Sequence, residues 1–132
     1  MNFLIVDDNY NNRILLQKIL TPFGDCDMAI DGKEAFDAFK MAMEDGKPYD
    51  LICLDIMMPE MNGQEALKAI REYERTKGID KDAGAKIIMA TALYTPQDLI
   101  EAFFNGGCND YLTKPIKRTE LLILLERYGI KT

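Results

Sequence analysis

Acidic, hydroxyl and ammonium side chains follow four of the apolar segments in this chain, close to where each segment ends. They are Asp7 and Asp8 after residues 3–6, Asp55 after 51–54, Thr91 after 86–90 and Lys114 after 110–112. A single acid in such a place is more often a turn former or a helix cap than a reactive group. Matching chemistry after four segments indicates a shared site instead.

Three carboxylates in one pocket require a cation. Two carboxylates about 5 Å apart repel each other by ~3 kcal/mol at an effective dielectric constant near 20. Oxygen ligands alone suit Mg²⁺, which binds carboxylates together with phosphate oxygens. Lys114 can neutralise remaining negative charge, and the Thr91 hydroxyl can donate to an anionic oxygen. These groups are the parts needed for phosphoryl transfer to a carboxylate, with Asp55 as the acceptor.

The segments that must position these residues alternate between two patterns. Short apolar runs predict strands at residues 3–6, 26–30, 51–54, 86–90 and 110–112. Helical periodicity and end signals predict helices after Asn9 or Asn11, after Asp31, after Gly63, from Thr95 to Gly107, and from Pro115 to Gly129. Alternation of this kind predicts a parallel sheet covered on both faces, and the carboxyl ends of parallel strands share one edge. We therefore expect one doubly wound α/β domain over residues 1–132, with the five reactive side chains at that edge.

Composition excludes several classes of function. The net charge of -6 argues against sequence-independent binding of nucleic acid or of an anionic membrane. The chain has no histidine, which rules out histidine catalysis and a phosphohistidine on this chain. Its three cysteines, at 26, 53 and 108, fit neither a disulfide framework nor a zinc site. Without a bilayer-length apolar run or a signal-peptide pattern, the expectation is a cytoplasmic protein with no membrane partner.

Together the motifs resemble the receiver domains of two-component response regulators, in particular the single-domain type found among chemotaxis regulators. The resemblance covers nearly the whole chain and rests on Asp7-Asp8, Asp55 with Met58-Pro59 and Gly63, Thr91-Ala92, Tyr111, and Lys114-Pro115. It implies a flavodoxin-like (βα)5 fold with a five-stranded parallel sheet in the order 2-1-3-4-5.

The resemblance also implies a role for each matched residue. Asp55 would accept a phosphoryl group from a phosphohistidine of a sensor histidine kinase or a histidine phosphotransfer protein. Asp8, Asp55 and the backbone carbonyl of Met57 would bind Mg²⁺, with Asp7 acting through water. Lys114 would contact the acceptor carboxylate and the phosphoryl oxygen, and its bond to Pro115 is expected to be cis.

Thr91 and Tyr111 are the implied switch pair. Phosphorylation adds about 1.5 to 2 negative charges, which would draw in the Thr91 hydroxyl and let Tyr111 rotate. The signal would appear on the face made by the fourth helix, the last strand and the fifth helix, where an effector protein would bind. In those helices Ile100, Phe104 and Leu122 fall off the main buried stripe, and some of them are expected to be exposed contacts. The chain is expected to be a monomer or a weak, phosphorylation-dependent dimer.

Two departures from the family pattern bear on the rate at which phosphate is lost, and the same region of the sequence argues against two other classes of protein. Met57 and Leu93 are apolar where polar residues of relatives position attacking water, so slow loss of phosphate is expected. An aspartate-nucleophile phosphatase would need an acid at Met57. A flavodoxin-like electron carrier would need a phosphate-binding loop after the first strand, but Asp7 and Asp8 stand there and would repel the phosphate. The chain is thus expected to assist only its own phosphorylation and dephosphorylation, either as a standalone regulator or as a receiver excised from a hybrid kinase.

Overall fold

Five parallel strands form a single sheet. A computed structural model of the chain describes residues 1–56, 58, 61–80, 82–91, 97 and 106–131. The strands are β1 (Asn2–Val6), β2 (Asp25–Ala29), β3 (Leu51–Asp55), β4 (Lys86–Thr91) and β5 (Asp110–Thr113). They pair in the order β2-β1-β3-β4-β5, and every pairing is parallel. This confirms the predicted strand order and sheet type.

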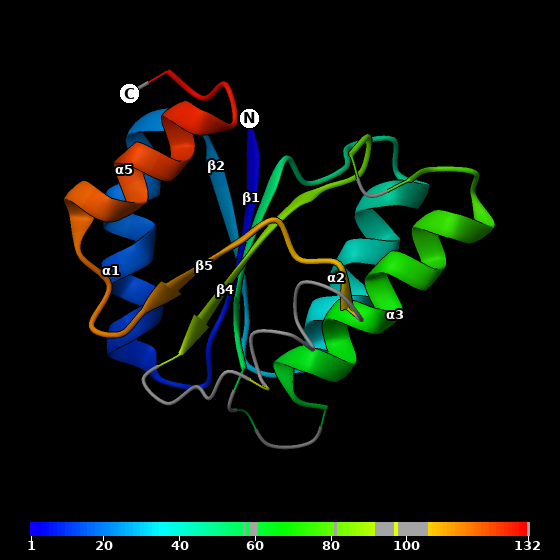
Figure 1. Ribbon diagram of the computed structural model, residues 1–132, viewed down its shortest axis with the longest axis horizontal. Helices are drawn as coiled ribbons and strands as arrows, with labels where there is room; N and C mark the ends of the chain where they lie inside the picture. Colours follow the sequence, from blue (N-terminus) through cyan, green and yellow to red (C-terminus); the bar gives the residue numbers. More distant parts are fainter. Residues whose placement is uncertain (57, 59–60, 81, 92–96, 98–105, 132) are drawn as a thin grey trace.

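Helices cover both faces of this sheet, as Figure 1 shows. Among the described residues they are α1 (Tyr10–Leu20), α2 (Gly32–Glu44), α3 (Gly63–Thr76) and α5 (Arg118–Arg127), with a short 3-10 turn, η1 (Thr21–Phe23), after α1. α1 and α5 lie on one side of the sheet, and α2 and α3 lie on the other. The predicted doubly wound arrangement is therefore confirmed. The helix expected from Thr95 to Gly107 falls almost entirely outside the described residues.

The two cores follow from the alternation of side chains along each strand. Phe3 and Ile5 of β1 pack with the buried leucines of α1 and α5, whereas Leu4 and Val6 pack with Phe39 of α2 and with α3. All four of these β1 side chains are at most 1% exposed. A strand buried on both faces has no polar side to show, which is why the central strands have continuous apolar sequences.

Side-chain caps start three of the helices where the sequence predicted a start. Asn9 accepts from the backbone N–H of Asn12 before α1, and Asp31 accepts from that of Glu34 before α2. Before α3, Asn62 and Glu65 form a reciprocal capping box. Each cap satisfies an N–H group that has no partner inside its helix. The loop-to-helix junctions at this edge of the sheet are thereby fixed.

Strand register brings the predicted reactive residues to the same level. Val6 lies opposite Leu54, Asp55 lies opposite Ala90, and Thr91 lies opposite Thr113. Each of these strands therefore ends within a residue or two of its neighbour. Among the described residues, no helix is both long and apolar enough to cross a bilayer.

Candidate functional site

Three carboxylates meet at the carboxyl edge of the sheet. Asp7 and Asp8 follow β1 and Asp55 is the last residue of β3, and one oxygen from each lies within 4.8 Å of the others. Asp7 is 1% exposed and Asp55 is 3% exposed, whereas Asp8 is exposed. The cluster therefore has two buried acids and one that opens to solvent.

Lys114, which directly follows β5, supplies the positive charge. Its Nζ donates to Asp7 Oδ2 at 2.7 Å and lies 3.3 Å from Asp55 Oδ2. Burial alone would lower the pKa of this ammonium, but the hydrogen bond to Asp7 and the charge of Asp55 outweigh it and raise the pKa. Lys114 is therefore a fixed cation between the two buried acids.

The chain next to Lys114 orients this side chain. The backbone N–H of Lys114 donates to the carbonyl of Thr91 at 2.9 Å, so the ends of β4 and β5 are tied together. The Lys114–Pro115 bond is cis, as the sequence analysis predicted. Thr91 is 2% exposed and is the last residue of β4, one strand over from Asp55.

The loop between β1 and α1 holds Asp7 by its backbone as well as by its side chain. Asp7 Oδ1 accepts from the N–H of Asn9 at 2.9 Å, and the Asp7 carbonyl accepts from Nη1 of Arg13 at 2.8 Å. The Arg13 guanidinium also lies 5.7 Å from the ring centroid of the exposed Tyr10. The sequence analysis did not single out Arg13, because a backbone carbonyl that accepts a hydrogen bond leaves no signal in the sequence.

Asp55 is held by backbone contacts at the start of the β3–α3 loop. The N–H of Ile56 donates to Ala90 at 3.1 Å, and the N–H of Gly63 donates back to Ile56 at 3.0 Å. A Cβ on Gly63 would lie only 2.1 Å from the Asp55 carbonyl oxygen. Only glycine allows this approach, which explains the glycine in the motif quoted above.

The remaining predicted site residues lie less centrally or fall outside the described residues. Tyr111 is half-buried on β5 and packs against the core under α2 and α3. Leu122 is half-buried against the other core. Met57, the predicted carbonyl ligand, lies outside the described residues, as do Leu93, Ile100 and Phe104. The structure thus brings together Asp7, Asp8, Asp55, Thr91 and Lys114.

The donor set of the cluster fits a hard divalent cation. Every candidate ligand atom in it is a carboxylate oxygen, and the described residues offer no other metal-binding group of this kind. Both oxygens of Asp7 already accept hydrogen bonds, from Asn9 and from Lys114. Asp8 and Asp55 are therefore better placed for direct ligation, and Asp7 for an indirect contact.

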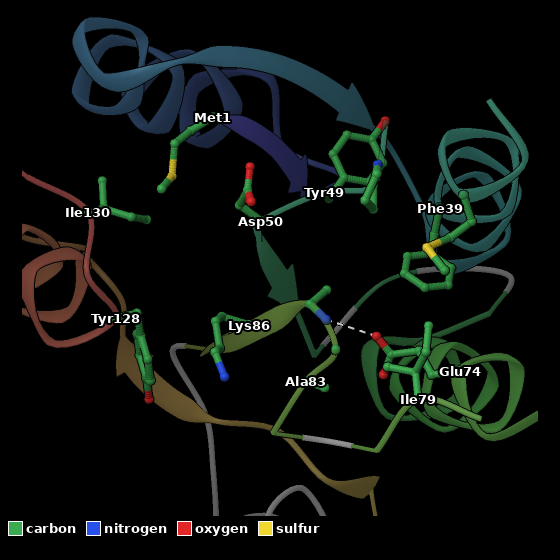
Figure 2. A pocket seen from close by; sticks show the side chains of 14 residues that line it. Met1, Phe39, Tyr49, Asp50, Glu74, Ile79, Ala83, Lys86, Tyr128 and Ile130 are labelled. Atoms are coloured by element: carbon green, nitrogen blue, oxygen red, sulfur yellow. Dashed lines mark hydrogen bonds between the residues drawn. The ribbon is translucent and has the colours of Figure 1, made fainter. Parts of the chain in front are cut away.

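A hollow lies at the opposite end of the sheet and is separate from this cluster. It has a volume of about 290 Å³, and its wall includes Met1, Asp50 and Lys86, which precede or begin β1, β3 and β4 (Figure 2). In its wall, the Glu74 carboxylate accepts a hydrogen bond from the N–H of Ala85 at 2.8 Å.

Comparison with known proteins agrees with this geometry. The family model for the response regulator receiver domain matches residues 3–126. Two-component response regulator 24 of Arabidopsis thaliana is 36% identical over 125 residues, which is 94% of this chain and 81% of that protein. Hybrid signal transduction histidine kinase L of Dictyostelium discoideum is 36% identical over 127 residues, 96% of this chain but only 7% of the kinase.

A solved structure of a receiver domain is also similar to this chain. The receiver domain of the Saccharomyces cerevisiae response regulator Ssk1, crystallised with the histidine phosphotransfer protein Ypd1, is similar with a TM-score of 0.84 and 33% identity. The match covers 98% of this chain and 88% of that chain. The resemblance therefore extends over both sequence and fold.

Proposed function

Since the chain belongs to the response regulator receiver domains, we propose that Asp55 accepts a phosphoryl group from a phosphohistidine donor. The observation that carries the proposal is the buried Asp55 carboxylate 3.3 Å from Lys114 Nζ, beside two further acids at the same edge of the sheet. No described lysine other than Lys114 forms an ion pair with a carboxylate of this cluster.

The proposed step is a displacement at phosphorus. An oxygen of the Asp55 carboxylate forms the new O–P bond while the P–N bond to the donor imidazole breaks, and the electron pair of that bond stays on the imidazole nitrogen. Lys114 lies where it can donate to a phosphoryl oxygen without moving far, because it already contacts Asp55. Its raised pKa keeps it charged throughout. The Thr91 hydroxyl is the second proposed donor to the phosphoryl group.

We propose that the step depends on Mg²⁺. Asp8 and Asp55, with the carbonyl of Met57, would hold the ion, and Asp7 would contact it through water. When bound, Mg²⁺ supplies the positive charge that lets a phosphoryl group approach three carboxylates. The oxygen-only donor set supports this assignment.

The proposed donor is a histidine phosphotransfer protein or a sensor histidine kinase. Apolar side chains are exposed beside the acid cluster: Tyr10 is 66% exposed and Leu15 is 42% exposed on α1. We propose that a protein donor contacts these side chains, because aromatic residues are enriched in protein–protein interfaces. The Ssk1 receiver domain crystallised with Ypd1 supports the same class of partner.

The proposed output is a change on the face made by β5, α5 and the helix expected from Thr95 to Gly107. Thr91 and Tyr111 would switch together, and an effector protein would read the result. Ile123 of α5, 59% exposed, belongs to this face, and Leu122 beside it is half-buried. We expect slow loss of phosphate, because Met57 and Leu93 offer no polar group to position water. The chain would thus be a cytoplasmic signalling module that acts on no external substrate. It would be a monomer or a weak, phosphorylation-dependent dimer. The chain would act either as a standalone regulator, for example in chemotaxis, or as the receiver domain of a hybrid histidine kinase.

Intact mass spectrometry tests the acceptor. The protein is incubated with Mg²⁺ and acetyl phosphate, beside Asp55→Asn and beside a sample treated with a chelator. We expect a gain of one phosphoryl group that is lost in both controls. Equal labelling of Asp55→Asn would assign the acceptor elsewhere, and equal labelling without metal would remove Mg²⁺ from the mechanism. A phosphate half-life of seconds would contradict slow turnover.

A further inference from the structure

The first residue of α2 contacts the loop that follows the phosphoacceptor. The N–H of Gly32 donates to the carbonyl of Met61 at 2.8 Å. Gly32 is buried, and Met61 lies in the loop between Asp55 and Gly63. An N–H in the first turn of a helix has no partner within the helix, so this loop carbonyl completes the start of α2.

The contact leaves no room for a side chain on Gly32. A Cβ built there would lie 2.3 Å from the Met61 carbonyl oxygen and 2.9 Å from Met61 Cγ. Non-bonded carbon and oxygen atoms normally stay more than about 3.2 Å apart, so the backbone at Met61 would have to retreat by roughly 1 Å. The Met61 oxygen belongs to the backbone and cannot swing away as a side chain would.

The residues that follow Met61 are held by contacts that limit how far the backbone can move. Two residues beyond Met61, Gly63 donates to the Ile56 carbonyl and packs directly on the Asp55 carbonyl oxygen. α3 begins at Gly63 and is fixed by its capping box. Through Gly63, a shift at Met61 would therefore reach the backbone of Asp55 and Ile56.

We propose that Gly32 is a positioning residue for the phosphoacceptor, holding Met61 and, through Gly63, the backbone of Asp55 in the position that accepts metal and phosphoryl group. The proposal rests on the function proposed for Asp55. Gly32 touches neither the acids nor the phosphoryl group and acts through Met61. α2 is thereby mechanically joined to the site, although none of its side chains belongs to the acid cluster.

The variant Gly32→Ala tests this role. We expect the rate constant for phosphorylation by acetyl phosphate to fall by about 10- to 100-fold, since a displacement near 1 Å can cost up to about 100-fold in a positioned reaction. The Mg²⁺ dissociation constant of the folded protein, measured by NMR titration, should rise at least several-fold. This second readout does not depend on turnover.

Gly84→Ala is the control at the opposite end of the sheet. A Cβ at Gly84 would lie 2.2 Å from the carboxylate of the buried Glu74, so a side chain would have to shift there, whereas at Gly32 it is the Met61 backbone. Both variants should lose stability, but only Gly32→Ala should lose Mg²⁺ affinity. If Gly84→Ala weakens Mg²⁺ binding as much, or if Gly32→Ala binds Mg²⁺ like the unmodified protein, the positioning role is refuted.

A measurement on the unmodified protein covers the case in which Gly32→Ala does not fold. The Gly32 amide resonance should shift during a Mg²⁺ titration, whereas the Gly84 amide should stay in place. An unmoved Gly32 amide in a protein that binds Mg²⁺ would overturn the inference and leave the function of Asp55 intact. Failure of the unmodified protein to bind Mg²⁺ and to gain phosphate would instead refute the proposed function itself.

Discussion

Replacing Lys114 with methionine should separate the two tasks of this side chain, neutralisation of the buried acids and contact with phosphate. At an effective dielectric constant near 20, the 2.7 Å contact with Asp7 amounts to about 6 kcal/mol and the 3.3 Å contact with Asp55 to about 5 kcal/mol. The cost of burying the ammonium offsets much of this attraction. Removing one partner from a buried ionic cluster typically costs about 3–5 kcal/mol, which is the loss we expect for Lys114→Met without metal.

Urea unfolding of four proteins gives the assay: the unmodified chain, Lys114→Met, Asp55→Asn and the double variant. Asp55→Asn should recover about 2 kcal/mol in the methionine background, where it removes repulsion from Asp7, and should not stabilise the lysine background to the same extent. Mg²⁺ should bind Lys114→Met more tightly than the unmodified protein, because a competing cation is gone. Phosphorylation should nevertheless fall.

The electrostatic reasoning would be wrong if Lys114→Met unfolded within about 1 kcal/mol of the unmodified protein in chelator, or if the two substitutions were additive. Tighter Mg²⁺ binding together with faster phosphorylation would refute the proposed contact of Lys114 with the phosphoryl group, while leaving its role in neutralisation intact.

Three further predictions concern the rest of the fold. Burial and the hydrogen bond to the Asp27 carboxylate raise the pKa of the Tyr49 phenol. The contribution of this phenol to the free energy of unfolding is therefore complete below the unfolded-state pKa of about 10 and is lost as the pH rises above it. Tyr49→Phe should reduce this alkaline loss of stability in urea titrations and cost about 1 kcal/mol at pH 7. Arg71→Met should leave the 2% exposed Glu74 carboxylate without its cation and lower the free energy of unfolding by about 3–5 kcal/mol, and a loss below 1 kcal/mol would contradict that. Burial raises the pKa of the Cys53 thiol to about 12, so a thiol reagent at pH 8 should modify half-buried Cys26 first and reach Cys53 only on unfolding, as peptide mapping would show.

Local signals in the sequence were enough to place most elements. The apolar runs at residues 3–6 and 51–54 have no polar side because both faces of a central parallel strand are buried. Asn9 and Asp31 cap helices within three residues of themselves, so their role can be read without knowing the fold. Strand order came from the family resemblance, since periodicity does not state which strands are neighbours.

Most of the site could also be predicted from the sequence. The carboxyl ends of parallel strands share one edge of the sheet, so the reactive side chains at four strand ends must lie near one another. Tertiary structure decided how the convergent groups differ. Asp7 and Asp8 are adjacent in the chain, yet one is buried with both oxygens bonded and the other is exposed. The Lys114 contact that distinguishes them joins residues 107 positions apart.

The sequence by itself determined which residues can do chemistry here and at which edge of a sheet they belong, because side-chain type and periodicity are written in it directly. Only the tertiary structure decided what holds them in place. Arg13 and Gly32 act on the carbonyl oxygens of Asp7 and Met61. Every residue has a carbonyl oxygen, so such a contact leaves no mark in the sequence of the acceptor and depends entirely on where the fold places the donor.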